Sequence, residues 1–212
     1  MNTLRVAFFV SGNGTLFERL ASKMRDGVIQ AEPALLMSSS ANAPAMERAR
    51  RLKVPCEALR REDFPSDEPF CQAMMKGLDQ HHVNFICLAG YLKLVPKSIV
   101  ETFRNRMLNI HPALLPAFGG KGMYGRKVFE AALDYGVRIH GATVHLVDDE
   151  YDHGPIVLQR AVFVALDDTP ETLQARVHKI EYDLYADAVK LFADDRVRID
   201  GRHVNILPAK PN

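Results

Sequence analysis

The feature that most constrains the fold of this chain is a continuous apolar run near its amino-terminal end, Val6-Ala7-Phe8-Phe9-Val10. An apolar residue at every position, rather than at every second one, is typical of a strand buried on both faces of a parallel sheet. The run leads into Ser11-Gly12-Asn13-Gly14-Thr15, after which Leu16, Leu20 and Met24 recur at helical spacing. The sequence therefore opens with a strand, a glycine turn and a helix, which is the first unit of an α/β fold.

The glycine turn is a candidate anion site. Glycines let the backbone approach a guest closely, and the amide groups at the start of a helix point toward it, so phosphate is the expected guest. The turn lacks the GxGxxG dinucleotide fingerprint and the Lys-Ser/Thr ending of a P-loop, so an ordinary turn is the alternative. Its place after a first buried strand favours phosphate, because α/β sheets bind ligands outside the carboxyl ends of their strands.

Strand-like and helix-like segments alternate along the rest of the chain, with no internal repeat, low-complexity tract or linker. This alternation predicts a single domain in which crossover helices join parallel strands. Strands are expected over 34–37, 54–59, 83–90, 106–110, 139–147 and 156–164, helices over 43–52, 70–81, 96–103, 128–135 and 169–192, and a hairpin over 196–206.

Composition excludes several classes of protein. The formal net charge of +1 gives no reason to expect nucleic acid or an anionic membrane as a partner. The three cysteines form no CxxC pair, which indicates reduced thiols in the cytoplasm. The sequence shows no secretory leader and no apolar run approaching the ~20 residues of a membrane helix. We therefore expect a soluble cytoplasmic protein.

Two polar side chains stand at the end of one expected strand. Arg106 to Ile110 is largely apolar, and Pro112 marks its end because proline cannot continue a ladder and biases the preceding residue toward extended geometry. Asn109 and His111 are two positions apart and so project to the same side, where an amide donor and an imidazole could act on one reacting atom. On spacing alone, a satisfied Asn and His beside a turn is the commoner case, and only the surroundings favour catalysis.

Other segments supply the remaining candidate groups. Pro116 to Lys127 contains four glycines and is expected to form a mobile loop of the kind that closes over polar strand ends. The acidic turn Asp148-Asp149-Glu150-Tyr151-Asp152 lacks the EF-hand pattern, so we expect a functional carboxylate there and no metal. Leu92-Lys93-Leu94-Val95 follows a strand and could wall a pocket for a flat ring, although core packing explains it equally well.

The chain resembles the glycinamide ribonucleotide formyltransferases from Arg5 to about Ile199. Its Asn-x-His-Pro-x-Leu-Leu-Pro run and its later Asp-x-Gly-Pro are specific to the wider formyltransferase group, and the Ser-Gly-Asn-Gly turn narrows the resemblance to the ribonucleotide enzymes. The motifs that carry it are Ser11-Gly12-Asn13-Gly14, Leu88-Ala89-Gly90-Tyr91, Asn109-Ile110-His111-Pro112-Ala113-Leu114-Leu115-Pro116, Val144-His145 and Asp152-His153-Gly154-Pro155.

The resemblance implies a Rossmann-like, mostly parallel sheet flanked by helices. It implies transfer of a formyl group from 10-formyltetrahydrofolate to the amine of glycinamide ribonucleotide, in the de novo synthesis of the purine nucleotide IMP. In this scheme Asn109 and a protonated His111 hold the oxyanion of the tetrahedral adduct, and Asp152 orients the imidazole and helps to move protons. Residues that match the ribonucleotide site are Gly12, Asn13, Gly14, Thr15, Leu16 and Glu181; those that match the folate site are Leu92, Lys93, Leu94, Val95, Asn109, Asp148, Asp149, Glu150, Tyr151 and Asp152.

The resemblance also implies how the chain is organised and where it departs from the family pattern. We expect one domain over residues 1–212, with a nucleotide-binding half to about residue 100 and a folate-binding and catalytic half from about residue 101, acting as a monomer or homodimer. Thr15-Leu16 stands where Ser-Asn is frequent, which leaves phosphate contact to the backbone, and the Gly119 to Gly125 loop is longer than in several members.

Three other functions are weighed against this one. Formyltransferases that act on methionyl-tRNA or an amino sugar usually carry further domains, and the first would show a basic face. Formyltetrahydrofolate hydrolase, in which water replaces the amine, normally carries an amino-terminal regulatory domain. A nucleotide-binding module without chemistry would not need Asn109, His111 and Asp152 together.

Overall fold

The structure is a computed structural model that describes residues 3–209. It has an α/β fold whose seven strands follow the order β3-β2-β1-β4-β5-β6-β7, and a separate two-stranded hairpin. The mostly parallel sheet flanked by helices that the resemblance implied is thereby confirmed. The chain divides into two compact units, Met1–Leu108 and Asn109–Asn212, each described here by itself. The prediction of a single domain with halves meeting near residue 100 stays a prediction.

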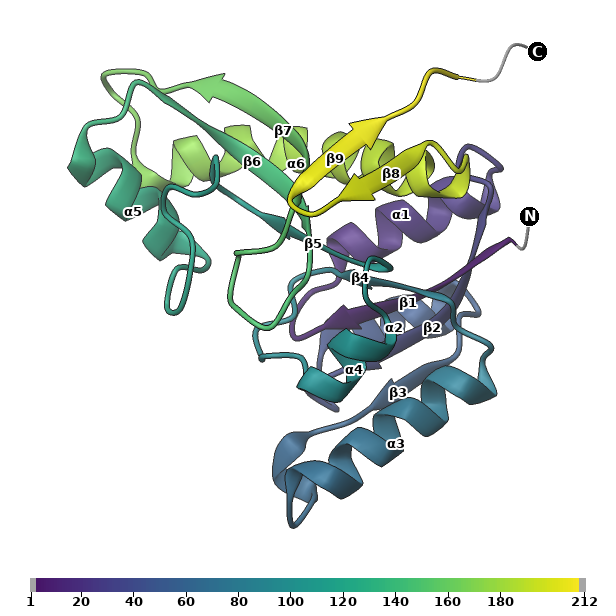
Figure 1. Cartoon of the computed structure of the whole chain (residues 1–212). Helices are drawn as coiled ribbons and strands as arrows, with labels where there is room; N and C mark the ends of the chain where they lie inside the picture. The colour runs from purple at the N-terminus through teal and green to yellow at the C-terminus, as the bar shows by residue number, and fades with distance from the viewer. Residues whose placement is uncertain (1–2, 210–212) are drawn as a thin grey trace. The chain divides into compact units, whose positions relative to one another are not determined.

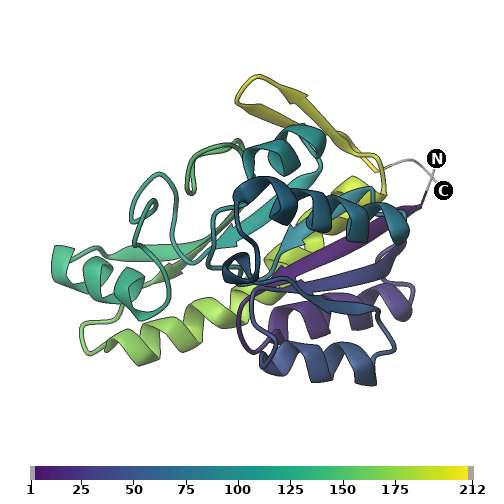
Figure 2. The ribbon, with the colours of Figure 1, turned by 90° about the horizontal axis from the view of Figure 1, so that it is seen from below.

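In the first unit, parallel strands alternate with helices. The strand β1 pairs with β2 on one side and with β4 on the other, and β2 pairs with β3, all in parallel. Figure 2 shows α1 and α2 on one face of these strands and α3 on the other. The elements are β1 (Leu4–Val10), α1 (Thr15–Arg25), β2 (Ala31–Ser38), α2 (Pro44–Arg51), β3 (Cys56–Ala58), a 3-10 turn (Arg61–Asp63), α3 (Asp67–Gln80), β4 (Phe85–Leu88) and α4 (Lys97–Thr102).

The apolar run that opens the sequence is the centre of this unit's core. Residues 6–10 of β1 have no exposed surface, as a strand covered by helices on both faces requires. The helix α1 contributes Phe17 and Leu20 to the same core, and the ring of Phe17 lies edge-on to that of Phe8, 5.0 Å between centroids. The predicted succession of strand, glycine turn and helix is confirmed.

Two elements begin three residues earlier than the sequence predicted, because proline is tolerated in both places. The helix α3 begins at Asp67, not at Phe70, and Pro69 lies in its first turn, where a missing N–H breaks no helical hydrogen bond. The strand β2 begins at Ala31, and Pro33 lies beside a register shift in the pairing with β1. Neither difference moves a candidate site residue.

The second unit contains the remaining elements, except that the first two residues of β5 belong to the first unit. The strands β6 and β7 form an antiparallel pair, and the helix α6 packs on both of them (Figure 1). The elements are β5 (Met107–His111), α5 (Arg126–Tyr135), β6 (Ile139–Leu146), β7 (Ile156–Phe163), α6 (Pro170–Ala193), β8 (Val197–Asp200) and β9 (His203–Ile206). None of the helices within residues 3–209 has the length and apolar character needed to cross a membrane.

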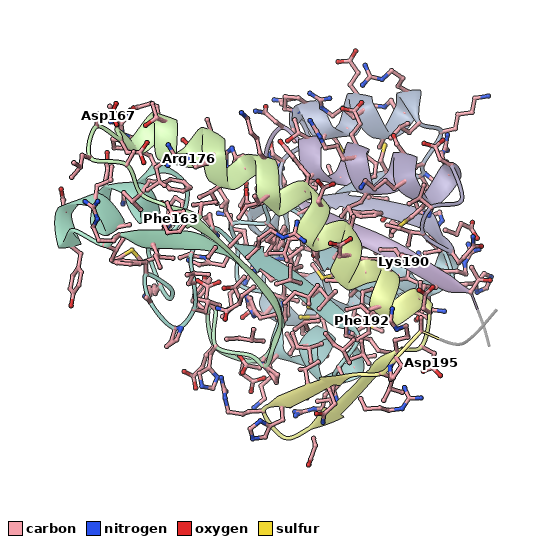
Figure 3. All side chains as sticks on the ribbon, turned by 90° about the horizontal axis from the view of Figure 1, so that it is seen from above. Phe163, Asp167, Arg176, Lys190, Phe192 and Asp195 are labelled. Atoms are coloured by element: carbon pink, nitrogen blue, oxygen red, sulfur yellow. The ribbon has the colours of Figure 1, made fainter. Side chains whose placement is uncertain are left out.

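A charged cluster fixes the start of α6. Asp168 accepts hydrogen bonds from both terminal nitrogens of Arg176, at 2.6 and 2.8 Å, and from the Ala165 amide at 2.8 Å. Arg176 also donates to the Phe163 carbonyl at the end of β7, 2.8 Å away, and Figure 3 shows Arg176 and Phe163 at this end of the helix. The Arg176 guanidinium, with these other donors, lowers the pKa of Asp168 to about 2.

Replacing Asp168 with asparagine is expected to lower the free energy of unfolding by about 1–2 kcal/mol at pH 7, a value reduced by the solvent exposure of Arg176. Because the folded-state pKa is depressed, this stabilisation is complete above the unfolded-state pKa near 4 and is lost as the pH falls toward 2. Urea denaturation at pH 7 and pH 2.5 measures it, with Asp167→Asn as the control. An equal deficit at both pH values would contradict the assignment.

Candidate active site

Asn109 and His111 lie where the sequence predicted, in the last three residues of the strand β5, Met107–His111. They are two residues apart in a strand and therefore face the same side of it. The His111 side chain is buried, with 5% of its surface exposed, whereas Asn109 is half-buried. The prolyl residue that follows, Pro112, ends the strand after His111, one residue later than expected.

Asp152 comes from the acidic turn after β6 and meets both residues. Its Oδ2 is 3.4 Å from Nδ1 of His111, and its Oδ1 is 3.4 Å from the amide nitrogen of Asn109. The backbone of Asp152 is left-handed, with φ 54°, a conformation that non-glycine residues adopt only where the surroundings hold it. The second unit thus brings together the three residues that the resemblance assigned to catalysis.

The glycine loop provides a further contact with this carboxylate. The Gly120 amide donates a hydrogen bond to Oδ2 of Asp152 at 2.9 Å. A Cβ atom on the preceding Gly119 would lie 2.5 Å from the end of the Leu115 side chain and 3.2 Å from Cβ of Asp152, so a larger residue there would have to displace Leu115 and crowd Asp152. At least two of the four glycines therefore bring loop backbone against the carboxylate. The mobility expected of the loop stays a prediction.

The Phe118 carbonyl fixes the tautomer of His111. It lies 2.7 Å from Nε2 of His111, and because a carbonyl only accepts, Nε2 carries a proton. In the neutral imidazole, Nδ1 then carries no proton, and its lone pair faces Oδ2 of Asp152. Protonation of Nδ1 would place an N–H opposite the carboxylate. The arrangement therefore suits a base that takes up one proton and is stabilised as a cation by its neighbour.

His145, on β6, is a site residue that the sequence reasoning did not select. Its Nδ1 lies 2.8 Å from the Leu146 carbonyl and must donate to it, so its Nε2 is an acceptor. That nitrogen is 3.0 Å from the amide nitrogen of Asn109, which therefore donates to it. The orientation of the Asn109 amide follows: one N–H is held by His145, and the other is directed toward Asp152 through a long contact that a substrate oxygen could replace.

The alternation of β6 gave a usable signal for His145. Thr143 and His145 are two residues apart in β6 and therefore face the same side of it, and both are buried. The sequence does not show which buried polar residue contacts the amide of Asn109. That contact depends on the register between strands that are distant in sequence.

The ionisation of the central pair follows from its surroundings. Burial lowers the pKa of His111, and the opposing attraction of Asp152 and the hydrogen bond to Phe118 do not restore it. Burial alone would raise the pKa of Asp152, but the neighbouring histidines and the Gly120 amide outweigh it, so that its pKa lies below the usual value of an aspartate. Near neutral pH this environment favours a neutral imidazole beside a carboxylate, in contrast to the protonated imidazole that the resemblance implied.

Glu181 is a buried carboxyl group on α6. Burial raises its pKa to about 7, and its side chain is 13% exposed. Within residues 3–209, the ionisable side chain that faces the Glu181 carboxyl group is His178, with 3.6 Å between Nε2 of His178 and Oε2 of Glu181. Burial also lowers the pKa of His178, so this histidine supplies little compensating charge. The carboxyl group therefore costs folding free energy, which a binding role would explain.

The glycine turn of the first unit is held by several contacts. The backbone of Gly14 is left-handed, with φ 68°, and a Cβ there would lie 2.5 Å from Cβ of Ala45 on α2. Arg48, also on α2, donates to the Asn13 carbonyl at 2.8 Å. Gly12, Asn13 and Thr15 remain exposed at the start of α1, and Leu16 is half-buried. A preformed turn with exposed backbone before a helix is suited to an anion.

The two segments that match the folate site lie in different units. In the first unit, the Leu92 amide donates to the Ser11 hydroxyl at 2.9 Å; the side chains of Leu92 and Leu94 are about half exposed, Lys93 is exposed and Val95 is buried.

In the second unit, Asp148 accepts from the Glu150 amide at 3.1 Å and pairs with His153 at 2.7 Å. Asp149, Glu150 and Tyr151 lie on the same turn as Asp152. Within residues 3–209 no three His, Cys, Asp or Glu side chains are grouped so that they could hold a metal ion. The expectation that the protein uses no metal stays a prediction.

Comparison with known proteins places this geometry in context. The formyl transferase family model matches residues 4–189. A phosphoribosylglycinamide formyltransferase of Arabidopsis thaliana, described as chloroplastic, is 40% identical over 98% of this chain and 72% of its own length. The phosphoribosylglycinamide formyltransferase of Bacillus subtilis is 36% identical over 88% of this chain and 93% of its own length.

Solved structures agree. Glycinamide ribonucleotide transformylase 1 from Symbiobacterium toebii superposes with a TM-score of 0.91 at 39% identity, covering 97% of this chain and 95% of that one.

Proposed function

Since the chain belongs to the formyl transferase family, and within it to the phosphoribosylglycinamide formyltransferases, we infer that it transfers the formyl group of 10-formyltetrahydrofolate to the amine of glycinamide ribonucleotide, in de novo purine biosynthesis. The observation that carries this inference to particular residues is the meeting of Asn109, His111 and Asp152 within one unit. An amide donor, an imidazole and a carboxylate are the groups that acyl transfer to an amine requires.

In the first step the amine attacks the formyl carbon, and the carbonyl oxygen becomes an oxyanion. The Asn109 N–H that is directed toward Asp152 is the donor positioned to stabilise this oxygen, while His145 holds the other N–H in place. A donor fixed before the reaction stabilises developing charge without reorganising.

The second step is proton transfer. The attacking nitrogen must lose a proton, and the folate nitrogen must gain one as it leaves. Nδ1 of His111 is the available lone pair, because Phe118 holds the proton on Nε2. The imidazolium that forms faces the Asp152 carboxylate, which lowers its free energy, and the same proton then passes to the leaving nitrogen. In this scheme His111 acts first as base and then as acid.

The substrate contacts are proposed from the same matches. Backbone amides from Gly12 to Leu16 would bind the ribonucleotide phosphate, and the Glu181 carboxyl would accept hydrogen bonds from the ribose. Leu92 to Val95 and the turn from Asp148 to Asp152 would bind the folate. A cytoplasmic location, a monomer or homodimer, and the absence of a metal are predictions of the sequence.

The test is turnover of 10-formyl-dideazafolate, followed by its absorbance change, with and without glycinamide ribonucleotide. Formyl loss that requires the ribonucleotide, with formylglycinamide ribonucleotide as the product, supports the proposal. Loss without ribonucleotide would identify a hydrolase, and tight binding of both compounds without turnover would identify a binding module.

The hydrolase is a reasonable second candidate because the fold alone does not separate the two. A formyltetrahydrofolate deformylase from Pseudomonas syringae has a TM-score of 0.87 with this chain at 22% identity, a likeness of fold only. The amine-dependent arm of the assay is therefore decisive.

Glu181→Gln tests the buried carboxyl group. Because its folded-state pKa is raised, folding is progressively disfavoured as the pH rises from about 4.5 to about 7. The substitution is expected to raise the free energy of unfolding by about 3 kcal/mol at pH 8 and by little at pH 4.5. The same variant should raise KM for the ribonucleotide about tenfold or more, since an amide replaces two acceptor oxygens. Glu171→Gln, on the exposed face of the same helix, is the control, and a KM equal to that of the parent would remove Glu181 from the site.

A further inference from the structure

His140 is an anomaly in the second unit. It lies on β6 with 1% of its surface exposed, and its Nε2 is the only buried side-chain nitrogen or oxygen within residues 3–209 that has no hydrogen-bond partner. Burying an unpaired polar atom costs stability, so such an atom calls for an explanation. A histidine kept only for packing would be better replaced by an aromatic residue without the orphaned nitrogen.

The other ring nitrogen supplies a first explanation. The backbone of Pro112 faces the His140 imidazole and raises its pKa against the effect of burial. Proline has no N–H, so the imidazole is the donor and the Pro112 carbonyl the acceptor. Because Nε2 is unpaired, the donor is Nδ1. His140 thus holds the carbonyl of the residue that directly follows His111.

The faces of the ring supply a second explanation. His140 packs edge-on against Phe118, with 5.9 Å between ring centroids, and against Phe129 on α5 at 5.7 Å. Phe118 has a left-handed backbone, with φ 54°, and its carbonyl is the acceptor for Nε2 of His111. A phenylalanine in that conformation needs neighbours that hold it, and His140 and Tyr135 pack on its ring.

We propose that His140 is a positioning residue for formyl transfer: its Nδ1–H fixes the Pro112 carbonyl and its ring supports Phe118, so that His111 keeps one orientation and one tautomer. The contribution to turnover depends on the function proposed above, whereas the effect on the His111 imidazole does not.

Two substitutions separate the two contacts. His140→Phe keeps the ring and removes both nitrogens, so it loses the Pro112 bond together with the orphaned atom. His140→Asn keeps a donor near the position of Nδ1 and loses most of the ring. Stability and activity should therefore rank in opposite orders. His140→Phe should have the higher unfolding midpoint, and His140→Asn the higher kcat.

The measurements are kcat, KM for the ribonucleotide, the unfolding midpoint and the ¹⁵N shifts of His111, assigned by comparison with His111→Asn. His140→Phe is expected to lower kcat by about tenfold to a hundredfold, with KM within about twofold of the parent. Its His111 shifts should move from those of an Nε2–H tautomer toward a mixture. His140→Asn should recover most of the lost kcat.

Leu173→Ala, in the core under α6, is the control. It should lower the unfolding midpoint without moving the His111 shifts. The proposal is overturned if His140→Phe keeps the parental His111 shifts, or if activity follows stability across the two His140 variants. If neither variant folds, Phe118→Leu decides, since unchanged His111 shifts there would also overturn it. A parent without turnover would overturn the proposed function, and the His111 shifts would still test His140.

Discussion

Asp152→Asn is expected to lower kcat by about 10²–10⁴-fold while the fold is retained. The carboxylate faces Nδ1 of His111, where the imidazolium forms, and an amide cannot supply the compensating charge. KM for both substrates should change little, because the loss arises in the transition state. Circular dichroism and the unfolding midpoint check the fold.

The same variant carries a second signature. The attraction of Asp152 raises the pKa of His111 against the effect of burial, so its removal should lower that pKa further. NMR titration of the His111 ring measures the shift. Asp187→Asn, a surface carboxylate paired with Arg160, is the matched control and should leave both kcat and the His111 pKa unchanged. A variant at position 152 with parental kcat would remove the proposed mechanism.

Asn109→Ala is expected to lower kcat by about 10²–10³-fold, the usual cost of removing one oxyanion donor. The alanine also leaves Nε2 of His145 buried without its donor, so the free energy of unfolding should fall by about 1–3 kcal/mol. Single-turnover kinetics with both substrates at saturation separates chemistry from binding.

Combination with the first variant tests whether the residues act as a unit. If Asn109 and Asp152 act on one tetrahedral adduct, the double variant should lose much less than the product of the two single losses. Asn205→Ala, exposed on β9, is the control for asparagine removal. Fully multiplicative losses would assign the two residues to separate steps.

Much of the fold followed from local pattern. The buried run in β1 and the long amphipathic α6 were predicted because apolar periodicity survives in almost any tertiary context. The start of α3 was predicted three residues late because the sequence pattern favours a helix that begins after Pro69. Proline in a first helical turn and proline before a helix are not distinguished by local pattern alone.

In the site, too, local pattern predicted some groups and not others. Asn109 and His111 were selected from their alternation in a strand before a proline, and Asp152 from its motif. The sequence did not predict three other groups of the site: the Phe118 carbonyl, the Gly120 amide and the acceptor nitrogen of His145. Backbone groups have no sequence signature, and their directions depend on left-handed residues and on strand register that spacing does not specify. The side chains of the candidate site could be predicted from the sequence, but the groups that orient them could not.

The left-handed backbone at Asp152 has a consequence for protein engineering. Glycine would adopt that conformation without strain, but at position 152 it would leave the Gly120 amide without its acceptor and His111 without a facing carboxylate. Relief of backbone strain and loss of turnover would therefore come from the same substitution. A screen of this enzyme for heat resistance has to be paired with a screen for turnover, because heat resistance alone does not select for the carboxylate.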